Sequence, residues 1–491
     1  METSRDLLTM TSLYATLDAR WDRPDHIAVR TDDVAITYAA LRRRVRRALG
    51  LLRQRGLSAG DVLALQTHRS LAFLELHLAA LAGGIVTLPL NPAYTPREVA
   101  FYLGDAKPKL AVLLAPPEAD VPFLPADGVR ALLDAAPESE PLWSLPERHP
   151  AVICYTSGTT GRPKGAVIQH RNILGTVEAL HGAWRWSRDD VLLHALPLFH
   201  IHGLFVAQHG ALYAGATSVW VQRFDADDAL ARIQAQGATV FMGVPTFYSR
   251  FLQQPGQALP GMRLFTSGSA PLPARVHSAF EEKFGHRILE RYGMTEVGIV
   301  LSNPYDQPRR PGTVGFPLPG VQVRICDDSG AELPDGEVGE VRISGPGVIE
   351  EYLGLPGKTA EAIVDGWMRS GDLAYRDEGG YIHISGRAKD MIISGGLNVY
   401  PVEVESVLLE HPAVAQAAVV GVPDDDLGER VVAVVIAAEP VAAAALVAHC
   451  RSALAGYKRP KEVVFVDAFP RNAMGKVQKA TLRASLSAGS R

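Results

Sequence analysis

The chain has few cysteines, no long apolar run and almost no net charge. Its 491 residues include three cysteines, Cys154, Cys326 and Cys450, which are too few and too scattered for a disulfide framework or a zinc site. We therefore expect all three to be structural thiols. The formal net charge of −4 gives no electrostatic footprint for nucleic acid or for an anionic membrane surface, so any anionic ligand must be attracted by local charge.

The sequence also argues against membrane-spanning and secreted proteins. No apolar stretch reaches the length of about 18 residues at which a transmembrane helix is considered. The segment Met1–Met10 carries acidic residues and lacks the apolar core of a secretory signal. With 47% hydrophobic and 21% charged residues, the chain is long enough for two or more globular domains. We expect a cytoplasmic protein, monomeric or homodimeric, without nucleic-acid or membrane partners.

Apolar runs alternate with helical patterns along roughly the first 300 residues. Runs such as Val62–Leu65 and Ala216–Val221 are typical of buried strands, and the mixed pattern over Tyr38–Gly56 is typical of a helix. This alternation predicts an α/β fold with buried parallel strands. The proline-rich segment from about Pro116 to Pro150 has no clear pattern and predicts a long connection.

The pattern changes in the last third of the chain. Short alternating strands at Val321–Ile325, Gly339–Ser344 and Tyr381–Ser385 predict an antiparallel β subdomain. Beyond Lys389, helices and strands alternate again over enough residues for a separate small domain. The predicted fold class is therefore α/β, with a large N-terminal domain over 1–388, built from α/β sheets plus the β subdomain, and a smaller α+β domain over 389–491.

The stretch Tyr155–Gly165 has the composition of a phosphate-binding loop. It contains three glycines, four Ser/Thr hydroxyls and a lysine, directly after the apolar run Ala151–Cys154. Glycines let successive backbone N–H groups converge on phosphate oxygens, and hydroxyls and an ammonium add donors. The same composition is common in ordinary surface loops. It is not a Walker loop, because Gly161–Lys164 places a proline between the hydroxyl cluster and the lysine.

Further segments carry polar side chains whose meaning depends on their order. They are Phe265–Leu272, Arg291–Glu296, Trp367–Asp372 with Gly386–Arg387, Lys389–Pro401 and Pro470–Lys476. Taken singly, an aspartate after a turn is usually a capping residue, and a lysine near a terminus is usually a solvated charge. Together with the loop, the segments resemble the motifs of the adenylate-forming enzymes, the superfamily of acyl-CoA synthetases, luciferases and nonribosomal-peptide adenylation domains.

The resemblance implies ATP, Mg²⁺ and coenzyme A as ligands. The nucleotide contacts that it implies are Thr156, Ser157, Gly158, Thr159, Thr160, Gly161 and Lys164 in the phosphate loop, Gly268, Ser269, Ala270, Tyr292 and Gly293 around the adenine, and Asp372 and Arg387 at the ribose. It implies that Thr295 contacts the α-phosphate and that Glu296 binds magnesium. Lys476 would bridge the carboxylate and the phosphate, and His200 matches the gate position. Metal and lysine would neutralise charge on the departing pyrophosphate.

The resemblance also implies that the C-terminal domain is a mobile lid. Lys389 matches the hinge position of the superfamily, and Gly395–Gly396 match a loop that closes over the site. In such enzymes a carboxylate first attacks the α-phosphorus of ATP to give an acyl-AMP. The lid then turns about the hinge, and the thiol of coenzyme A displaces AMP.

Arg291 bears on which acid the enzyme uses. Many relatives that take aromatic or fatty acids have an uncharged or small residue at this position. A guanidinium beside an acyl pocket is costly to bury unless it is paired, and a second substrate carboxylate can pair with it in a bidentate geometry. His202 is a further candidate, because it can donate to a polar acyl tail, and Met294 is a third.

The sequence around these residues is similar to malonyl-CoA synthetases, notably Met242–Tyr248, Ser302–Tyr305 and Gly312–Gly315. Val297–Leu301 departs from the bacterial members, and a more apolar wall would suit a substituted malonate. We expect an ATP-dependent acid:CoA ligase that forms malonyl-CoA through malonyl-AMP and releases AMP and pyrophosphate. The alternatives are a methylmalonyl-CoA or other short-chain acyl-CoA synthetase, a luciferase-type monooxygenase, an amino-acid adenylation enzyme and a non-catalytic nucleotide-binding protein.

Overall fold

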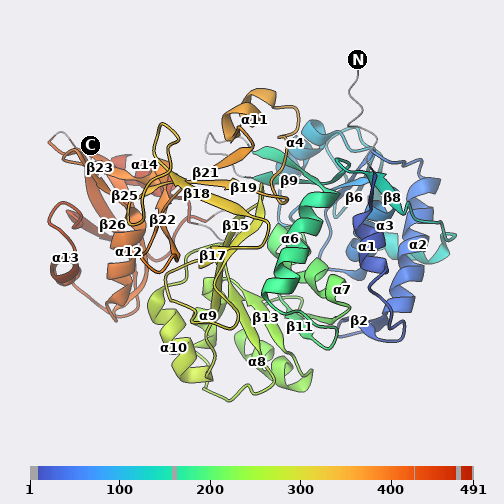
Figure 1. The fold of residues 1–491 in the computed structure, drawn as a ribbon, viewed down its shortest axis with the longest axis horizontal. Helices are drawn as coiled ribbons and strands as arrows, with labels where there is room; N and C mark the ends of the chain where they lie inside the picture. Colours follow the sequence, from blue (N-terminus) through green and yellow to red (C-terminus); the bar gives the residue numbers. More distant parts are fainter. Residues whose placement is uncertain (1–8, 157–162, 425, 472–476, 489–491) are drawn as a thin grey trace.

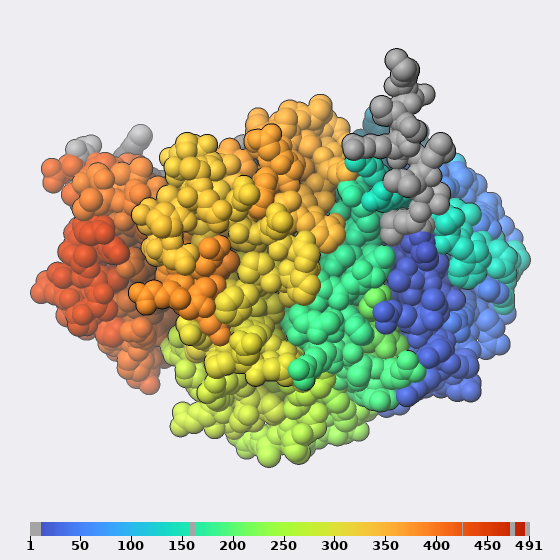
Figure 2. Space-filling model, viewed as in Figure 1, coloured from blue at the N-terminus to red at the C-terminus, as the bar shows by residue number. Residues whose placement is uncertain are grey.

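The computed structural model describes residues 9–156, 163–424, 426–471 and 477–488. Two α/β sheets, an antiparallel β subdomain and a small C-terminal domain make up the molecule (Figure 1). Figure 2 shows the N-terminal part of the chain, in blue, at one end of the visible face and the C-terminal domain, in orange and red, at the other. No helix within these described ranges has both the length and the apolar character needed to cross a membrane.

The first α/β sheet has six strands and holds the segment that leads into the phosphate loop. Its strand order is β10 (Lys164–Gln169), β9 (Pro150–Thr156), β5 (Val86–Pro89), β4 (Val62–Leu65), β6 (Leu110–Leu113) and β7 (Phe123–Pro125). Only the β10–β9 pair is antiparallel. Its helices are α2 (Tyr38–Gln54), α3 (Leu71–Gly83), α4 (Pro96–Ala106) and α5 (Val129–Ala135), with η1 (Ala126–Gly128) before α5. Almost every residue of α3 is buried, because the helix is predominantly apolar, and Glu75 and His77 are buried with the rest.

The second α/β sheet has nine strands. Its order is β17 (Phe316–Pro317), β16 (Gly298–Ser302), β15 (Leu289–Met294), β14 (Leu264–Ser267), β13 (Val240–Gly243), β11 (Val191–His194), β12 (Thr217–Trp220), β2 (Ile27–Arg30) and β3 (Ala35–Thr37). The six strands from β15 to β2 are parallel, so their carboxyl ends meet at one edge. Its helices are α6 (His170–Ala183), the π-helix η2 (His202–His209), α7 (Gly210–Ala214), α8 (Ala226–Ala235), α9 (Pro245–Phe251) and α10 (Ala274–Phe284).

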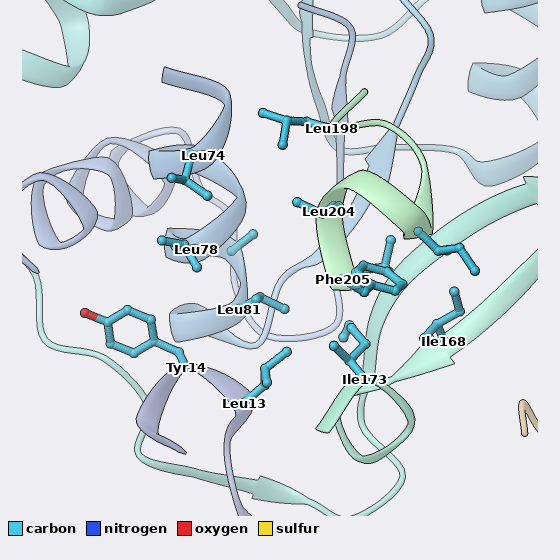
Figure 3. Close-up of a cluster of buried hydrophobic side chains, with 14 of the residues drawn as sticks. Leu13, Tyr14, Leu74, Leu78, Leu81, Ile168, Ile173, Leu198, Leu204 and Phe205 are labelled. Atoms are coloured by element: carbon cyan, nitrogen blue, oxygen red, sulfur yellow. The ribbon is translucent and has the colours of Figure 1, made fainter. Parts of the chain in front are cut away.

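The two α/β sheets share one apolar core. Figure 3 shows part of it, where side chains from α1 (Leu13–Asp18), α3, β10, α6 and η2 meet, among them Leu13, Tyr14, Leu74, Leu78, Leu81, Ile168, Ile173, Leu204 and Phe205. Burying one such side chain contributes about 1.5–3 kcal/mol. The core therefore fixes the phosphate-loop sheet against the sheet that carries the other motifs.

The β subdomain and the C-terminal domain complete the fold. The antiparallel subdomain has the order β18 (Gln322–Cys326), β19 (Gly339–Ser344), β21 (Trp367–Arg376) and β20 (Ile363–Val364), and β22 (Ile382–Arg387) also pairs with β21. α11 (Pro356–Ala362) precedes β20, and β1 (Thr9–Thr11) pairs with β8 (Ser144–Pro146).

The C-terminal domain consists of one mixed sheet and three helices. The sheet has the order β24 (Leu397–Val399), β23 (Ile392–Ser394), β26 (Gly428–Ala437) and β25 (Val414–Asp424), with β27 (Glu462–Phe465) parallel to β26. The helices are α12 (Pro401–Glu410), α13 (Ala443–Ala453) and α14 (Lys479–Ala488). The boundary predicted at Lys389 falls in the short turn η3 (Ala388–Asp390), and the hinge movement stays a prediction.

Most of the predicted elements are confirmed, and the prediction for one region is wrong. The runs Val62–Leu65 and Ala216–Val221 are strands β4 and β12, and the helix predicted over Tyr38–Gly56 is α2. The segment Pro116–Pro150 is not a featureless connection, because it holds β7, η1, α5 and β8. The helix α5 buries only Val129 and Leu133, so its apolar periodicity is too short to stand out in the sequence.

The three cysteines are free and buried. Burial, followed by the charge of Glu296, raises the pKa of the Cys154 thiol to about 12. A thiol with such a pKa stays protonated at neutral pH and is a poor nucleophile. Its location agrees with the structural role expected for it.

A pair of buried histidines joins the two α/β sheets. His77 of α3 and His209 at the end of η2 contact each other through their Nε2 atoms at 3.0 Å, and the rings are stacked. His170, at the start of α6, accepts a hydrogen bond at Nδ1 from the backbone N–H of Leu13. Burial lowers the pKa of all three rings, to about 3 for His170 and His209, so they are neutral in the folded protein.

The buried histidines predict acid-sensitive stability. Because each folded-state pKa lies below the unfolded value of 6.5, their contribution is complete above pH 6.5 and is lost as the pH falls toward 3. As the pH falls through this range, protonation of each ring in the unfolded state should lower the free energy of unfolding by up to about 1.4 kcal/mol per pH unit. Urea unfolding midpoints at pH 7 and pH 5 measure this slope. The double variant His77→Gln/His209→Gln should flatten it, whereas the exposed control His68→Gln should not; an unchanged slope in the double variant would refute the assignment.

Candidate active site

The predicted site residues gather where the carboxyl edge of the nine-stranded sheet meets β10 and the β subdomain. Gly268 follows β14, and Arg291–Met294 form the end of β15. Asp372 and Arg387 are paired with each other across β21 and β22. Residues that are far apart in the sequence therefore approach one another, because the parallel strands end at one edge and the β subdomain packs beside it.

Tyr292, Asp372 and Arg387 form a hydrogen-bonded group. The Tyr292 hydroxyl donates to Asp372 Oδ2 at 2.5 Å, and Arg387 Nε lies 2.6 Å from Asp372 Oδ1. Burial, and then the Asp372 carboxylate, raises the pKa of Tyr292. A carboxylate can accept about four hydrogen bonds, so an aspartate is a chemically suitable acceptor for a vicinal diol such as a ribose. The structure thus brings these three residues together, and their contact with a nucleotide stays a prediction.

Lys164, Tyr352 and Glu296 form a second group. Glu296 is buried and accepts a hydrogen bond at Oε1 from the Tyr352 hydroxyl at 2.9 Å. Lys164 Nζ lies 4.1 Å from the centre of the Tyr352 ring. The sequence motifs did not point to Tyr352. A tyrosine that follows a Gly-Pro-Gly turn carries no signal of its own, and the bridge between Ala166 and Tyr352 forms only in the folded chain.

The hairpin between β15 and β16 presents Thr295 and Glu296. Gly298 in this hairpin has φ +69° and lies so close to α6 that a Cβ would be 2.2 Å from Thr176 Oγ1. A glycine is therefore required there both by conformation and by space. The backbone carbonyl of Glu296 accepts a hydrogen bond from Ile349 N–H at 2.9 Å, which ties the hairpin to the segment that carries Tyr352.

Glu296 is suited to holding a magnesium ion beside a polyphosphate. Its Oε1 accepts the hydrogen bond from Tyr352, and a carboxylate has further lone pairs with which to contact a cation. Mg²⁺ is usually bound by one or two carboxylates together with substrate phosphates and water. No group of three or more His, Cys, Asp or Glu side chains with metal-site geometry occurs among the described residues, so a shared site with ATP fits better than an all-protein cage.

Arg291 is buried, and none of the residues that the structure describes provides it with a counter-ion. Its side chain lies in the protein interior, and Nε and Nη2 have no hydrogen-bond partner among the described residues. Burial lowers the pKa of the guanidinium to about 9. The adjacent carboxylate of Glu290 does not pair with it, because successive side chains of a strand point to opposite faces. Glu290 instead accepts hydrogen bonds from the N–H groups of Leu272 and Gly312.

His202 lies near Arg291. Burial, followed by the charge of Arg291, lowers the pKa of His202 well below its usual range, so the ring is neutral. Its Nδ1 is 3.2 Å from Ser269 Oγ, and Nε2 has no partner in the described part of the chain. The ring of His200 is half-buried and its Nδ1 accepts a hydrogen bond from His202 N–H at 3.2 Å. The two histidines are thus neighbours, with His202 on the side of Arg291.

Other predicted residues lie at different places. Met294 packs with Tyr292 against the core that the two sheets share. Gly293 is paired with Ile299 of β16. Lys389 is exposed in η3, and Gly395–Gly396 form the turn between β23 and β24, where φ values of 59° and 75° match a tight hairpin turn.

The structure leaves part of the prediction outside its described ranges. Ser157, Gly158, Thr159, Thr160 and Gly161 of the phosphate loop, and Lys476, lie outside the described residues. Thr156 ends β9, where it is paired with Lys164. Ala270 is exposed, and Ser269 has an unusual φ of +70°. Val297 and Ile299–Leu301, expected to line or support the acyl pocket, are buried in apolar cores.

Comparisons with known proteins show which family the sequence and fold belong to. The family model described as AMP-binding enzyme matches residues 18–353, and the model of the AMP-binding enzyme C-terminal domain matches residues 403–476. The chain is 36% identical to the sulfoacetate–CoA ligase of Cupriavidus necator, over 96% of this chain and 97% of that protein. It is also 36% identical to the mitochondrial malonate–CoA ligase of Mus musculus, over 88% of this chain and 83% of that protein.

A solved structure shows the same fold over almost the whole chain. ATP-bound MatB from Rhodopseudomonas palustris superposes with a TM-score of 0.93 at 42% sequence identity, covering 98% of this chain and 100% of that one. The fold, the grouping of Tyr292, Asp372 and Arg387, and the family matches lead to one assignment. The chain belongs to the AMP-binding enzyme family and is an acyl-CoA ligase, an acid–thiol ligase of the adenylate-forming type.

Proposed function

We propose that this ligase activates a short acid that carries a second acidic group, with malonate as the favoured substrate, and transfers it to coenzyme A. The products would be malonyl-CoA, AMP and pyrophosphate. The observation that carries the proposal is the buried guanidinium of Arg291, which has no counter-ion among the described residues.

The energetic argument is one of charge pairing. An uncompensated buried charge costs several kcal/mol, as a rough figure, and a second acidic group on the substrate would offset that cost. A guanidinium also presents parallel N–H donors that match a carboxylate in two contacts. Nε2 of His202 adds a further polar atom without a partner in the described chain. A fatty or aromatic acid would leave both groups unpaired.

The relatives support a short acid with two acidic groups. Sulfoacetate and malonate, the acids in the names of two relatives, each combine a carboxylate with a second acidic group on a one-carbon spacer. Arg291 can pair with either kind of second group, and both relatives have the same sequence identity to this chain, so sequence identity does not decide between sulfoacetate and malonate. Malonate is favoured because the planar carboxylate matches the bidentate fork. Methylmalonate is less favoured, because the apolar residues after Glu296 belong to buried cores.

In the first half-reaction, the substrate carboxylate attacks the α-phosphorus of ATP, a C–O–P linkage forms, and the bond to the pyrophosphate oxygen breaks. The group of Tyr292, Asp372 and Arg387 would hold the adenosine, and Thr295 would contact the α-phosphate. Lys164 and Lys476 would balance charge on the reacting phosphates. When bound, Mg²⁺ held by Glu296 would neutralise charge on the pyrophosphate.

In the second half-reaction, the thiol of coenzyme A attacks the acyl carbon, and AMP leaves as the carbon–oxygen bond breaks. We propose that the C-terminal domain turns about Lys389 between the two steps. This would withdraw Lys476 and bring in the Gly395–Gly396 turn. The exposure of Lys389 and its position in a short turn between two sheets support a hinge at this residue.

Acid-dependent exchange of pyrophosphate into ATP tests the substrate class. Malonate should exceed propionate, which has a methyl group in place of the second carboxylate, by about 30- to 1,000-fold in kcat/KM, equivalent to about 2–4 kcal/mol of pairing. Methylmalonate, sulfoacetate, long-chain fatty acids and amino acids complete the panel. Exchange with only fatty acids or amino acids would contradict the proposal.

Replacing Arg291 tests the residue that sets the preference. Arg291→Ala should lower kcat/KM for malonate by about 100-fold or more while the KM for ATP changes by less than about twofold. The kcat/KM of Arg291→Lys for malonate should fall between those of the wild type and Arg291→Ala, because an ammonium keeps the charge but not the planar fork. The exposed Arg55→Ala provides the control. Unaltered malonate dependence in both Arg291 variants would remove the basis for a diacid.

The contact between Tyr352 and Glu296 predicts an effect on the metal requirement. Tyr352→Phe keeps the ring beside Lys164 but removes the hydroxyl that donates to Glu296. Because such orienting partners tune metal ligands, half-maximal exchange should need about tenfold more Mg²⁺. A magnesium titration of the exchange rate measures the shift. Tyr375→Phe in the same subdomain should behave as wild type, and an equal magnesium requirement in Tyr352→Phe would count against the assignment of Glu296.

A further inference from the structure

We propose that Gly268 determines the specificity for a diacid, because its missing side chain provides the space in which the guanidinium of Arg291 lies. The family resemblance connects this glycine with the adenine. The inference rests on the proposed function and adds to it a second residue on which recognition of the acid depends.

The close approach is visible in the distances. A Cβ built on Gly268 would lie 2.4 Å from Cζ, 2.6 Å from Nε and 2.6 Å from Nη1 of Arg291. Three atoms of one planar group are thus nearly equidistant from the same point, so the guanidinium lies against the backbone of Gly268. Real Cβ atoms essentially never approach other atoms this closely. Any side chain at position 268 must therefore displace the guanidinium.

The strand register explains why these two residues meet. β14 and β15 are parallel neighbours in which Ser267 is paired with Glu290. One residue further along, Gly268 lies beside Arg291. Paired positions in neighbouring strands send their side chains to the same face of the sheet. A Cβ on Gly268 would therefore point to the face on which the Arg291 side chain lies.

The surroundings limit where the guanidinium can go. Both Arg291 and Tyr248 are buried, and the Tyr248 hydroxyl is held by a hydrogen bond of 2.5 Å to the carbonyl of Thr266. His202 is also buried, and its Nδ1 lies 3.2 Å from Oγ of Ser269, the residue after Gly268. Because these groups are buried, the displaced guanidinium would lose the position in which it can receive a second acidic group.

The backbone itself would tolerate alanine. Gly268 does not have a positive φ, so alanine brings no conformational strain at this position. The predicted clash involves only the end of a flexible side chain, which can move. Gly268→Ala should therefore leave the fold intact and alter recognition of the acid. A misplacement of about 1 Å can cost roughly 100-fold in rate.

A double-mutant cycle tests whether Gly268 acts through Arg291. The variants are Gly268→Ala, Arg291→Ala and the double variant, measured by malonate-dependent and propionate-dependent pyrophosphate exchange. Gly268→Ala alone should lower kcat/KM for malonate by about 30- to 100-fold and change the KM for ATP by less than about twofold. In the Arg291→Ala background the same substitution should cost less than about twofold, because the group that it displaces is absent.

Two results would overturn the inference. Additive losses from the two substitutions would show that Gly268 acts independently of Arg291. A rise in the KM for ATP that matches the loss with malonate would place Gly268 at the adenine. Thermal midpoints of all variants, with Gly104→Ala as a glycine-to-alanine control in open space, separate misfolding from altered recognition. Wild-type enzyme that fails to use malonate would refute the proposed function itself, whereas a working wild type with an additive cycle would refute only the inference.

Discussion

The site depends on the way β15 is held between two neighbours. Its first residues pair in parallel with β14, and its last residues pair in antiparallel fashion with β16, with an irregularity after Tyr292. One continuous segment therefore presents Arg291 toward Gly268, Tyr292 toward Asp372 and, in the turn after β15, Glu296 toward Tyr352. A slip of one residue in this register would turn every one of these side chains to the other face. The residues proposed to bind the acid, the nucleotide and the metal are thus carried by one strand and the turn that follows it.

The same segment carries two buried ionisable side chains, Glu290 and Arg291, next to the proposed acid-binding site. Arg291 and Glu290 are both buried and adjacent, yet they face opposite sides of the strand and do not neutralise each other. Burial raises the pKa of Glu290 to about 8 and lowers that of Arg291 to about 9. Glu290 accepts hydrogen bonds from two backbone N–H groups, whereas Nε and Nη2 of Arg291 have no acceptor among the described residues. In the proposed function, a second acidic group of the substrate would supply that acceptor.

The sequence predicted much of the fold and named several residues that the structure places together. The α/β sheets, the β subdomain and the C-terminal domain follow from apolar periodicity, because long buried elements leave a strong pattern. Asp372 and Arg387 were recognised from their motifs, and the structure brings them to Tyr292. The helix α5 was missed because only two of its residues anchor it in the core. Tyr352 was missed because it reaches Glu296 only through tertiary contacts.

The sequence by itself determined the class of chemistry, since the motif residues supply donors, a metal ligand and lysines in an order that the superfamily shares. It also determined that one buried-strand position carries an arginine. Only the tertiary structure decided that this arginine has no counter-ion in the described chain and that it lies against Gly268. Pairing of charges and contact between strands depend on which segments become neighbours in space. Those distances are set by sheet register and packing, and no local pattern of residues contains them.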